Sequence, residues 1–228
     1  MSTSTLRMAA LALLVPVLAL AAIVLARPAP AEAHPLGNFT VNRYSRLELY
    51  SDAIRVRYIL DMAEIPTFQE TPAIDANDDG ELSPPENEAY LRTKSAEIVR
   101  NLRLAANGSN LNLTMLSGDV TYPEGQAGLK TLRLTFLLNA PVSANDIALE
   151  YGDDNYADRV GWKEVVVRAT DGVTVSATDA ATEDASAELT TYPADLLSSP
   201  LDVTSARVSY SAAGGAVAPA VDAVQVAA

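Results

Sequence analysis

The sequence predicts a mainly β protein: an immunoglobulin-like antiparallel β-sandwich with a helical insertion that carries an EF-hand-like loop. Three observations support this fold class. Short apolar segments with a period of two recur through the middle of the chain, turn-forming residues separate them, and a single stretch has helical spacing. Seven such segments with turns between them are typical of two packed antiparallel sheets.

The first 33 residues have the layout of a secretory signal peptide. An uncharged apolar run of 19 residues, Met8 to Ala26, follows Arg7 and leads into RPAPAEA, which predicts cleavage after Ala33. A run of this length can also span a bilayer, so an uncleaved signal anchor is the alternative. We therefore expect an exported protein, periplasmic or at the cell surface, with a membrane anchor if the signal is retained.

The charge and the missing cysteines narrow the function classes. The chain has a net charge of −13, and loss of the signal would make it one unit more acidic. An acidic surface repels nucleic-acid phosphates and attracts cations, so nucleic acid is not an expected partner. An exported domain without cysteine has no disulfides, and its stability must come from a hydrophobic core or from a bound metal.

The expected sandwich covers residues 34–178. In AIRVRYILDM, for example, Ile54, Val56, Tyr58 and Leu60 fall on one face. The segments with strand patterns are FTVNRYSRLELY from Phe39, AIRVRYILDM from Ala53, NLNLTML from Asn110, LKTLRLTFLLN from Leu129, DIALEY from Asp146, WKEVVVRA from Trp162 and GVTVSAT from Gly172.

One stretch, residues 63–104, interrupts the strand pattern. IPTFQE, which starts at Ile65, indicates a short helix with Pro66 in its first turn. ENEAYLRTKSAEIVRNLRL then presents apolar and small residues at helical spacing, namely Leu91, Ser95, Ile98 and Leu102. We expect these two helices to form an insertion within the sandwich.

Residues 179–228 have a different composition, rich in Ala, Ser, Thr, Asp and Pro. Such a segment buries little apolar surface to offset the entropy lost on ordering, so we expect a low-complexity linker or a disordered tail. LDVTSARVSYS, near Val203, could add one more strand.

The segment DANDDGELSPPE, between the two expected helices, matches the calcium-loop pattern D-x-[DN]-x-[DN]-G-x5-E at every position. Calcium requires six to eight hard oxygen ligands, which a tight loop supplies from alternate residues. The predicted ligands are Asp75, Asn77, Asp79, the backbone carbonyl of Glu81, Ser83 and Glu86. The alternative is an Asx-rich surface turn that binds no ion.

The loop is also expected to start a helix. Gly80 would permit the turn at position 6, while Ser83 and Glu86 fit a capping box with Pro84 at the first helical position. The loop occurs once, whereas calcium sensors open a groove between helices in response to the ion. A constitutive structural Ca²⁺ is therefore favoured over a calcium-driven switch.

The single histidine is a second, speculative metal ligand. Cleavage after Ala33 would make His34 the N-terminus, where its amine and ring nitrogen could chelate copper or nickel. In the simpler interpretation His34 is only the residue that follows the cleavage site.

Catalysis is not expected. One histidine and no cysteine nearly exclude Ser-His and Cys-His nucleophile pairs. The acidic segment GDDNYAD, with Asp153, Asp154 and Asp158, could hold a glycosidase carboxylate pair or a second cation, but a solvated connection between strands is favoured. The nearby Trp162 and Tyr156 are expected in the core or at its rim.

The stretches HPLGNFTVNRYSRLEL from His34, RVRYILDMAEIPTFQE from Arg55 and GWKEVVVRA from Gly161 resemble the exported N-terminal domain of bacterial nickel/cobalt transporter-like membrane proteins. The resemblance covers about His34 to Thr178 and includes the Asp75 loop. In that family a multi-helix membrane part follows the domain and carries the metal path.

The resemblance implies a non-catalytic, extracytoplasmic accessory domain, either a truncated transporter or a stand-alone relative, since the sequence lacks the transport helices. It would bind calcium and present a nickel, cobalt or copper ion, or a partner, to a membrane transporter component. The alternative is a generic secreted or anchored binding or adhesion sandwich whose calcium is purely structural.

Overall fold

The computed structural model describes residues 35–221 and the backbone of residues 225–227. The chain divides into two units, Met1–Glu32 and Ala33–Ala228, and the fold described below belongs to the second. The expected signal peptide, residues 1–33, and His34 lie outside the described residues. The described part is mainly β, with two sheets and two α-helices.

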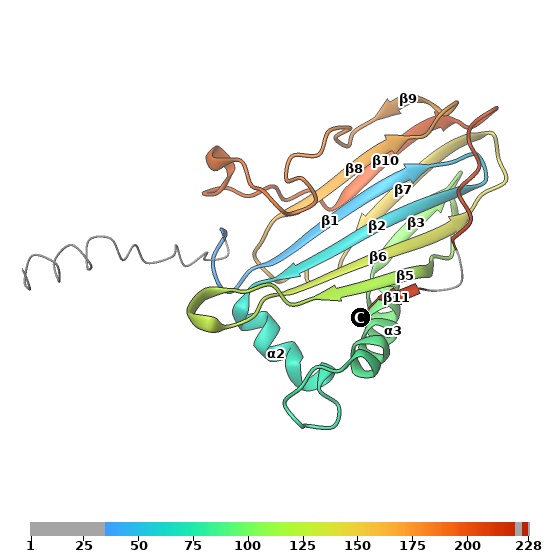
Figure 1. Ribbon diagram of the computed structural model, residues 1–228. Helices are drawn as coiled ribbons and strands as arrows, with labels where there is room; N and C mark the ends of the chain where they lie inside the picture. Colours follow the sequence, from blue (N-terminus) through green and yellow to red (C-terminus); the bar gives the residue numbers. More distant parts are fainter. Residues whose placement is uncertain (1–34, 222–224, 228) are drawn as a thin grey trace, which may run out of the picture. The chain divides into compact units, whose positions relative to one another are not determined.

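The first sheet has six strands (Figure 1), in the order β11 (Gln225–Ala227), β5 (Thr114–Thr121), β6 (Leu132–Pro141), β2 (Ala53–Met62), β1 (Val41–Leu49) and β8 (Lys163–Ala169). The pairs β5–β6, β6–β2 and β2–β1 are antiparallel. The pairs β1–β8 and β11–β5 are parallel, so the expectation of a purely antiparallel sandwich does not hold for this sheet. In both parallel pairs the partners are far apart in sequence, because a parallel pair needs a long crossover connection.

The second sheet has five strands, all paired antiparallel, in the order β4 (Ser109–Asn110), β3 (Leu102–Ala106), β7 (Asp146–Asp153), β10 (Ser205–Ser211) and β9 (Thr174–Thr178). Two short 3-10 helices, η1 (Gln126–Gly128) and η2 (Ala194–Leu196), lie in connecting segments. The structure splits the expected strand at Asn110 into β4 and β5, with irregular backbone over residues 111–113.

One hydrophobic cluster joins the inner faces of the two sheets, as in a β-sandwich. The predicted alternation is confirmed, because Ile54, Val56, Tyr58 and Leu60 are fully buried on the inner face of β2. Ile59, on the opposite face of the same strand, is fully buried as well. A second layer must therefore cover the outer face of the first sheet.

That layer comes from the segment expected to be a linker. Residues 181–202, here called the strap, begin and end in isolated β-bridges to β8. Leu189 of the strap packs in one hydrophobic cluster with Trp162 and Ile59. Farther along, β10 lies between β7 and β9 and buries Val208 and Tyr210. The structure thus differs from the expected linker or disordered tail over residues 179–221, while β10 (Ser205–Ser211) lies in LDVTSARVSYS, where one more strand was considered. The average composition of that tail is polar, but a few of its apolar residues are spaced so that they can pack on a sheet. They are enough to order the segment because the sheet already provides their partners.

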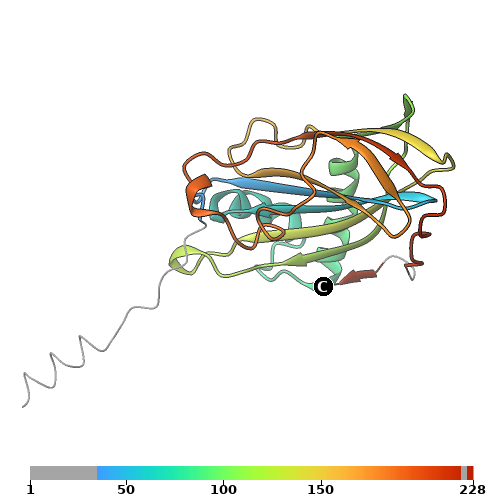
Figure 2. The ribbon, with the colours of Figure 1, turned by 90° about the horizontal axis from the view of Figure 1, so that it is seen from above.

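The helical insertion consists of α2 (Glu64–Ile74) and α3 (Pro84–Arg100). Both lie below the strands in Figure 1 and behind them in Figure 2. The predicted apolar stripe is buried, but its last member, Leu102, already belongs to β3, because α3 ends at Arg100. Within the described part of the chain, neither helix combines the length and apolar character needed to cross a membrane.

Candidate calcium-binding loop

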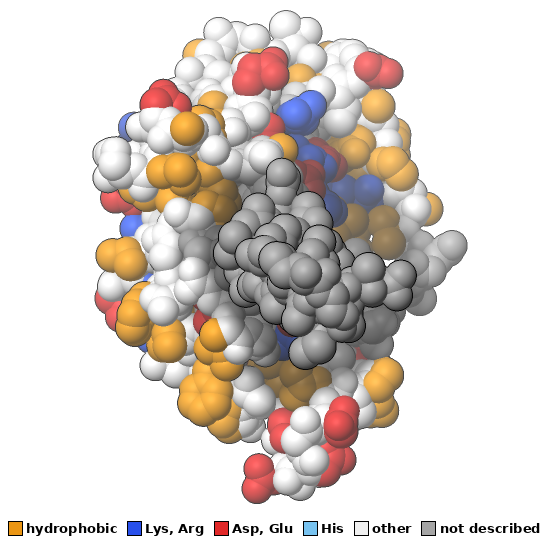
Figure 3. All heavy atoms as spheres, turned by 60° about the vertical axis from the view of Figure 1, so that its left-hand side comes forward, with side chains coloured by type: hydrophobic (Ala, Val, Ile, Leu, Met, Phe, Trp, Pro, Cys, Tyr) orange, Lys and Arg blue, Asp and Glu red, His pale blue; other side chains and the backbone are white. Residues whose placement is uncertain are grey.

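The calcium-loop pattern, Asp75 to Glu86, connects α2 to α3. Asp75 is the residue at which α2 ends, and its N–H donates to the Thr71 carbonyl. Ser83 is the N-cap of α3, and Pro84 is its first residue. Figure 3 shows acidic side chains at the lower tip of the molecule, where this loop lies in Figure 1. The structure therefore places the first and last ligand positions at the ends of two helices.

The first half of the loop is folded by its own side-chain oxygens. The Asp75 carboxylate accepts the N–H groups of Asp79, at 3.1 Å, and Gly80, at 2.9 Å. The Asn77 carbonyl accepts the Asp79 N–H at 2.8 Å, and the Asp79 carboxylate accepts the Glu81 N–H at 2.8 Å. These Asx turns bring positions 1, 3 and 5 of the pattern around one short stretch of backbone.

Gly80 has a φ of +83°, and a Cβ at this position would meet no atom within 4 Å. The need for glycine is therefore conformational, because residues with a Cβ rarely adopt this left-handed backbone. The predicted turn at position 6 is present.

Glu86 joins the two ends of the loop. One carboxylate oxygen accepts the N–H groups of Ala76, at 3.0 Å, and Asn77, at 3.3 Å. The other accepts the Ser83 hydroxyl at 2.6 Å and the Ser83 N–H at 3.1 Å, which is the glutamate half of a capping box. The bonds from Ser83, followed by those from the other two N–H groups, hold the pKa of Glu86 below its ordinary value.

Hydrogen bonds thus link all six predicted ligand residues, and Glu81 takes part through its backbone N–H. Among residues 35–221, no three Asp, Glu or His side chains are arranged as a metal-binding group. The donors are all carboxylate, amide, hydroxyl and carbonyl oxygens, the ligand chemistry that a hard cation such as calcium takes. These residues therefore fit a calcium ion by the type of their donor atoms. In the structure, hydrogen bonds from backbone N–H groups hold their side-chain oxygens in place.

Lys94 ties the helices that flank the loop to the sandwich. This nearly buried side chain contacts Glu70 of α2 at 3.1 Å, Glu97 at 2.9 Å and the Tyr156 hydroxyl at 3.2 Å. Burial lowers the pKa of Lys94, but the bonds to these acidic groups outweigh it and leave the pKa above its ordinary value. Lys94 was not predicted from the sequence, although it follows Leu91 by three positions on the buried stripe of α3.

The three carboxylates of the second acidic segment, GDDNYAD, lie in different environments. Asp154 and Asp158 are exposed, as expected for a solvated connection, and Asp154 lies 3.4 Å from Arg103. Asp153 is buried and lies 3.4 Å from the buried Arg43 inside the sandwich. The pKa of Asp153 is raised, because burial outweighs Arg43 and the donors of Asn155.

Trp162 and Tyr156 lie where the sequence suggested. Trp162 is fully buried, donates to Glu164 at 2.8 Å and meets Tyr192 edge to face at 5.3 Å. Tyr156 is partly buried beside Lys94.

Comparisons of the chain with protein-family models, with curated proteins and with solved structures gave no match.

Proposed function

We propose that this chain is a non-catalytic, extracytoplasmic calcium-binding domain that serves as an accessory to a membrane transporter for nickel, cobalt or a similar ion. The observation that supports it best is the loop from Asp75 to Glu86. All positions of the calcium pattern are present, Gly80 has the left-handed backbone that position 6 requires, and Glu86 contacts both ends.

Calcium would act as a structural ion in this proposal. The side chains of Asp75, Asn77, Asp79, Ser83 and Glu86 and the carbonyl of Glu81 would hold it. When bound, the ion would supply positive charge to a loop whose carboxylates repel one another. The chain's own residues align the exit of α2 with the start of α3, and Lys94 fixes both helices to the sandwich. Calcium would thus stabilise the helical insertion.

The first experiment measures calcium binding. The full chain, stripped of metal, is titrated with calcium by calorimetry and melted with calcium or with a chelator. A ligand present at 100 times its Kd stabilises the folded state by about 2.7 kcal/mol, so the midpoint should rise with calcium. Asp75→Ala should abolish both signals, while Asp158→Ala, which removes the same charge from an exposed site outside the loop, should keep them. If calcium left the unfolding midpoint of the wild-type protein unchanged, the proposal would be contradicted.

The transporter part of the proposal rests on the resemblance of the stretches at His34, Arg55 and Gly161 to the exported domain of nickel/cobalt transporter-like proteins. The immunoglobulin-like type of the sandwich and a copper or nickel role of His34 belong to the same proposal. Cross-linking in intact cells should capture a multi-helix membrane protein as the neighbour. Capture of extracellular ligands instead would favour the second candidate, a secreted or anchored binding sandwich with structural calcium.

That second candidate is favoured by one observation of its own. The outer face of the first sheet has a cavity of about 590 Å³ lined by charged side chains, away from the loop that joins α2 and α3.

A further inference from the structure

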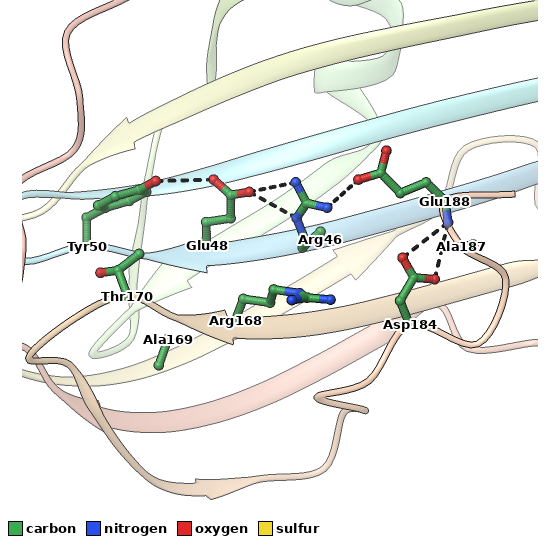
Figure 4. Close-up of a pocket in the computed structure, with 9 residues that line it drawn as sticks. All are labelled: Arg46, Glu48, Tyr50, Arg168, Ala169, Thr170, Asp184, Ala187 and Glu188. Carbon is green, nitrogen blue, oxygen red and sulfur yellow. Dashed lines mark hydrogen bonds and ion pairs between the residues drawn. The ribbon is translucent and has the colours of Figure 1, made fainter. Parts of the chain in front are cut away.

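This cavity, here called the strap pocket, lies between the strap and the outer face of the first sheet. Its walls come from β1, from the end of β8 and from strap residues 184–188, and it has a volume of about 590 Å³ (Figure 4). Charged side chains dominate the walls. The pocket therefore differs from the apolar interior between the sheets.

Most arginines of this outer face already have partners in the protein. Glu188 of the strap contacts Arg46 with one carboxylate oxygen and accepts a hydrogen bond from Arg57 with the other, at 3.0 Å. The Glu188 carbonyl accepts a hydrogen bond from Arg133. Arg46 also lies 2.8 Å from Glu48. These contacts hold the strap against the sheet and leave little donor capacity in the three arginines.

Arg168, at the end of β8, is the exception in this pocket. It is exposed, and its guanidinium has no hydrogen bond or ion pair with any residue that the structure describes. In the β1–β8 register Arg168 lies directly opposite Glu48, but the Glu48 carboxylate is engaged by Arg46 and lies beside the Tyr50 hydroxyl. Figure 4 shows the Arg168 side chain extended toward Asp184, next to Arg46. Its five N–H donors are therefore available to a ligand.

The strap wall has an unusual backbone. Ala187, Glu188 and Leu189 have φ values of 48°, 59° and 63°, three successive non-glycine residues in the left-handed region. Each such residue costs about 1–2 kcal/mol. Buried Leu189, the Glu188 contacts and the Asp184 carboxylate, which accepts the Glu188 N–H at 3.1 Å, keep the segment in place. Strain that the surroundings maintain in this way is concentrated at ligand clamps and active sites.

We propose that the strap pocket binds a carboxylate group through the guanidinium of Arg168, with the charge of the paired Arg46 nearby. A guanidinium matches a carboxylate with two parallel N–H bonds, and Arg168 has both donors unused. The acidic residues Glu48, Asp184 and Glu188 in the same walls would repel a polyanion, so the ligand carries one or two carboxylates rather than a chain of phosphates. This proposal does not depend on calcium binding.

A titration followed by amide NMR tests it on the full chain. The probes are succinate, an acetylated tetra-alanine peptide with a free C-terminal carboxylate, and the same peptide as its C-terminal amide. We expect saturable shifts at Ala169, Thr170 and Ala187 with one or both carboxylate probes and none with the amide. Saturation by succinate would identify a small acid as the ligand class, and saturation by the free peptide alone would identify a peptide terminus.

Variants then locate the contact. Arg168→Gln should raise the Kd of the carboxylate probe by about tenfold or more, because a charge-assisted hydrogen-bonded pair is lost. The Kd of Arg168→Lys should lie between those of the wild type and Arg168→Gln, since lysine keeps the charge but lacks the planar guanidinium. Arg100→Gln, an equal charge change at an exposed residue of α3 outside the pocket, should bind as the wild type does. No saturable shift in the pocket, equal shifts with the amide peptide, or wild-type affinity in Arg168→Gln would each overturn the proposal.

Discussion

The two acidic segments, Asp75–Glu86 and Asp153–Asp158, look alike in sequence, but the loop carboxylates and Asp153 have different environments. The loop carboxylates are exposed or partly buried and accept hydrogen bonds from nearby backbone N–H groups. Asp153 is buried between the sheets, where Arg43 is its charged partner at 3.4 Å. Glu86 consequently has a lowered pKa and Asp153 a raised one.

The difference shows that the neighbours of an acidic residue determine its role. In the loop, local backbone donors arrange the oxygens, so the first segment can act as a ligand set. In the sandwich, one buried ion pair crosses from β1 to β7, and Arg43 is the charged partner of Asp153. Variants of the two segments should therefore differ strongly in their effect on stability.

The largest effect is expected for Asp153→Ala. It leaves Arg43 buried without its charged partner, because the Arg43 guanidinium makes no hydrogen bond within the described residues. Loss of one member of a buried pair typically costs about 3–5 kcal/mol, which urea unfolding would measure. The exposed Asp154→Ala should change stability by less than about 0.5 kcal/mol.

A double variant sharpens this result. Arg43→Met combined with Asp153→Leu removes both charges from the interior and should be more stable than Asp153→Ala alone. If the single and double variants lost equal stability, packing rather than charge would explain the role of Asp153.

The next effect concerns Lys94, which connects the two regions through Glu70 and Tyr156. Lys94→Met keeps the apolar stem but removes hydrogen bonds to charged groups, and a loss of about 1–3 kcal/mol is expected in urea unfolding. Arg92→Met serves as the control, because Arg92 pairs with Glu88 on the exposed side of the same helix and should cost less than about 1 kcal/mol. Equal losses would show that Lys94 does not join the insertion to the sandwich.

A smaller effect is expected for Gly80→Ala, which tests the loop backbone alone. No atom lies close to the added Cβ, so the loss of about 1 kcal/mol would come from the left-handed φ. Gly80→Asn should lose less, because asparagine tolerates this backbone. Thermal unfolding in the presence of a chelator measures both variants, and an unchanged midpoint for Gly80→Ala would mean that the loop does not need this turn.

The smallest effect is the pH dependence. Glu86 should titrate below its ordinary 4.5 and Asp153 above its ordinary 3.8 in carbon-detected NMR. The contribution of Glu86 is present above its unfolded pKa and is lost as the pH falls through its lower folded pKa. Asp153 has the opposite sign, because its ionised form is disfavoured in the fold and acidification removes that cost. Shifts in the same direction would contradict the contrast between the segments.

Local pattern predicted much of the fold. The alternation in β2 and β6 identified the inner residues of both strands, because side chains on a strand alternate strictly between two faces. The stripe with Leu91 and Ile98 identified α3 for the analogous reason. The strap was misjudged, since it is stable only against strands formed far away in the sequence. The extra strand considered in LDVTSARVSYS is present as β10.

The loop illustrates the same limit for the site. Its arrangement of predicted ligands could be expected from spacing alone, because the Asx turns, the turn at Gly80 and the hydrogen bonds to Glu86 involve residues close in sequence. Arg168 could not be found in this way. Its availability depends on Arg46 and Tyr50 engaging Glu48 and on a strap that joins the sheet from another part of the chain.

The sequence by itself therefore determined the strand alternation, the helical insertion and the oxygen-rich loop, since short-range backbone geometry governs all three. Tertiary structure alone decided that Asp153 is buried with Arg43, that Lys94 joins the helices to the sandwich, and that the strap forms a pocket over β1 and β8. The physical reason is that burial and charge pairing depend on contacts between residues far apart in the chain, which local composition does not encode.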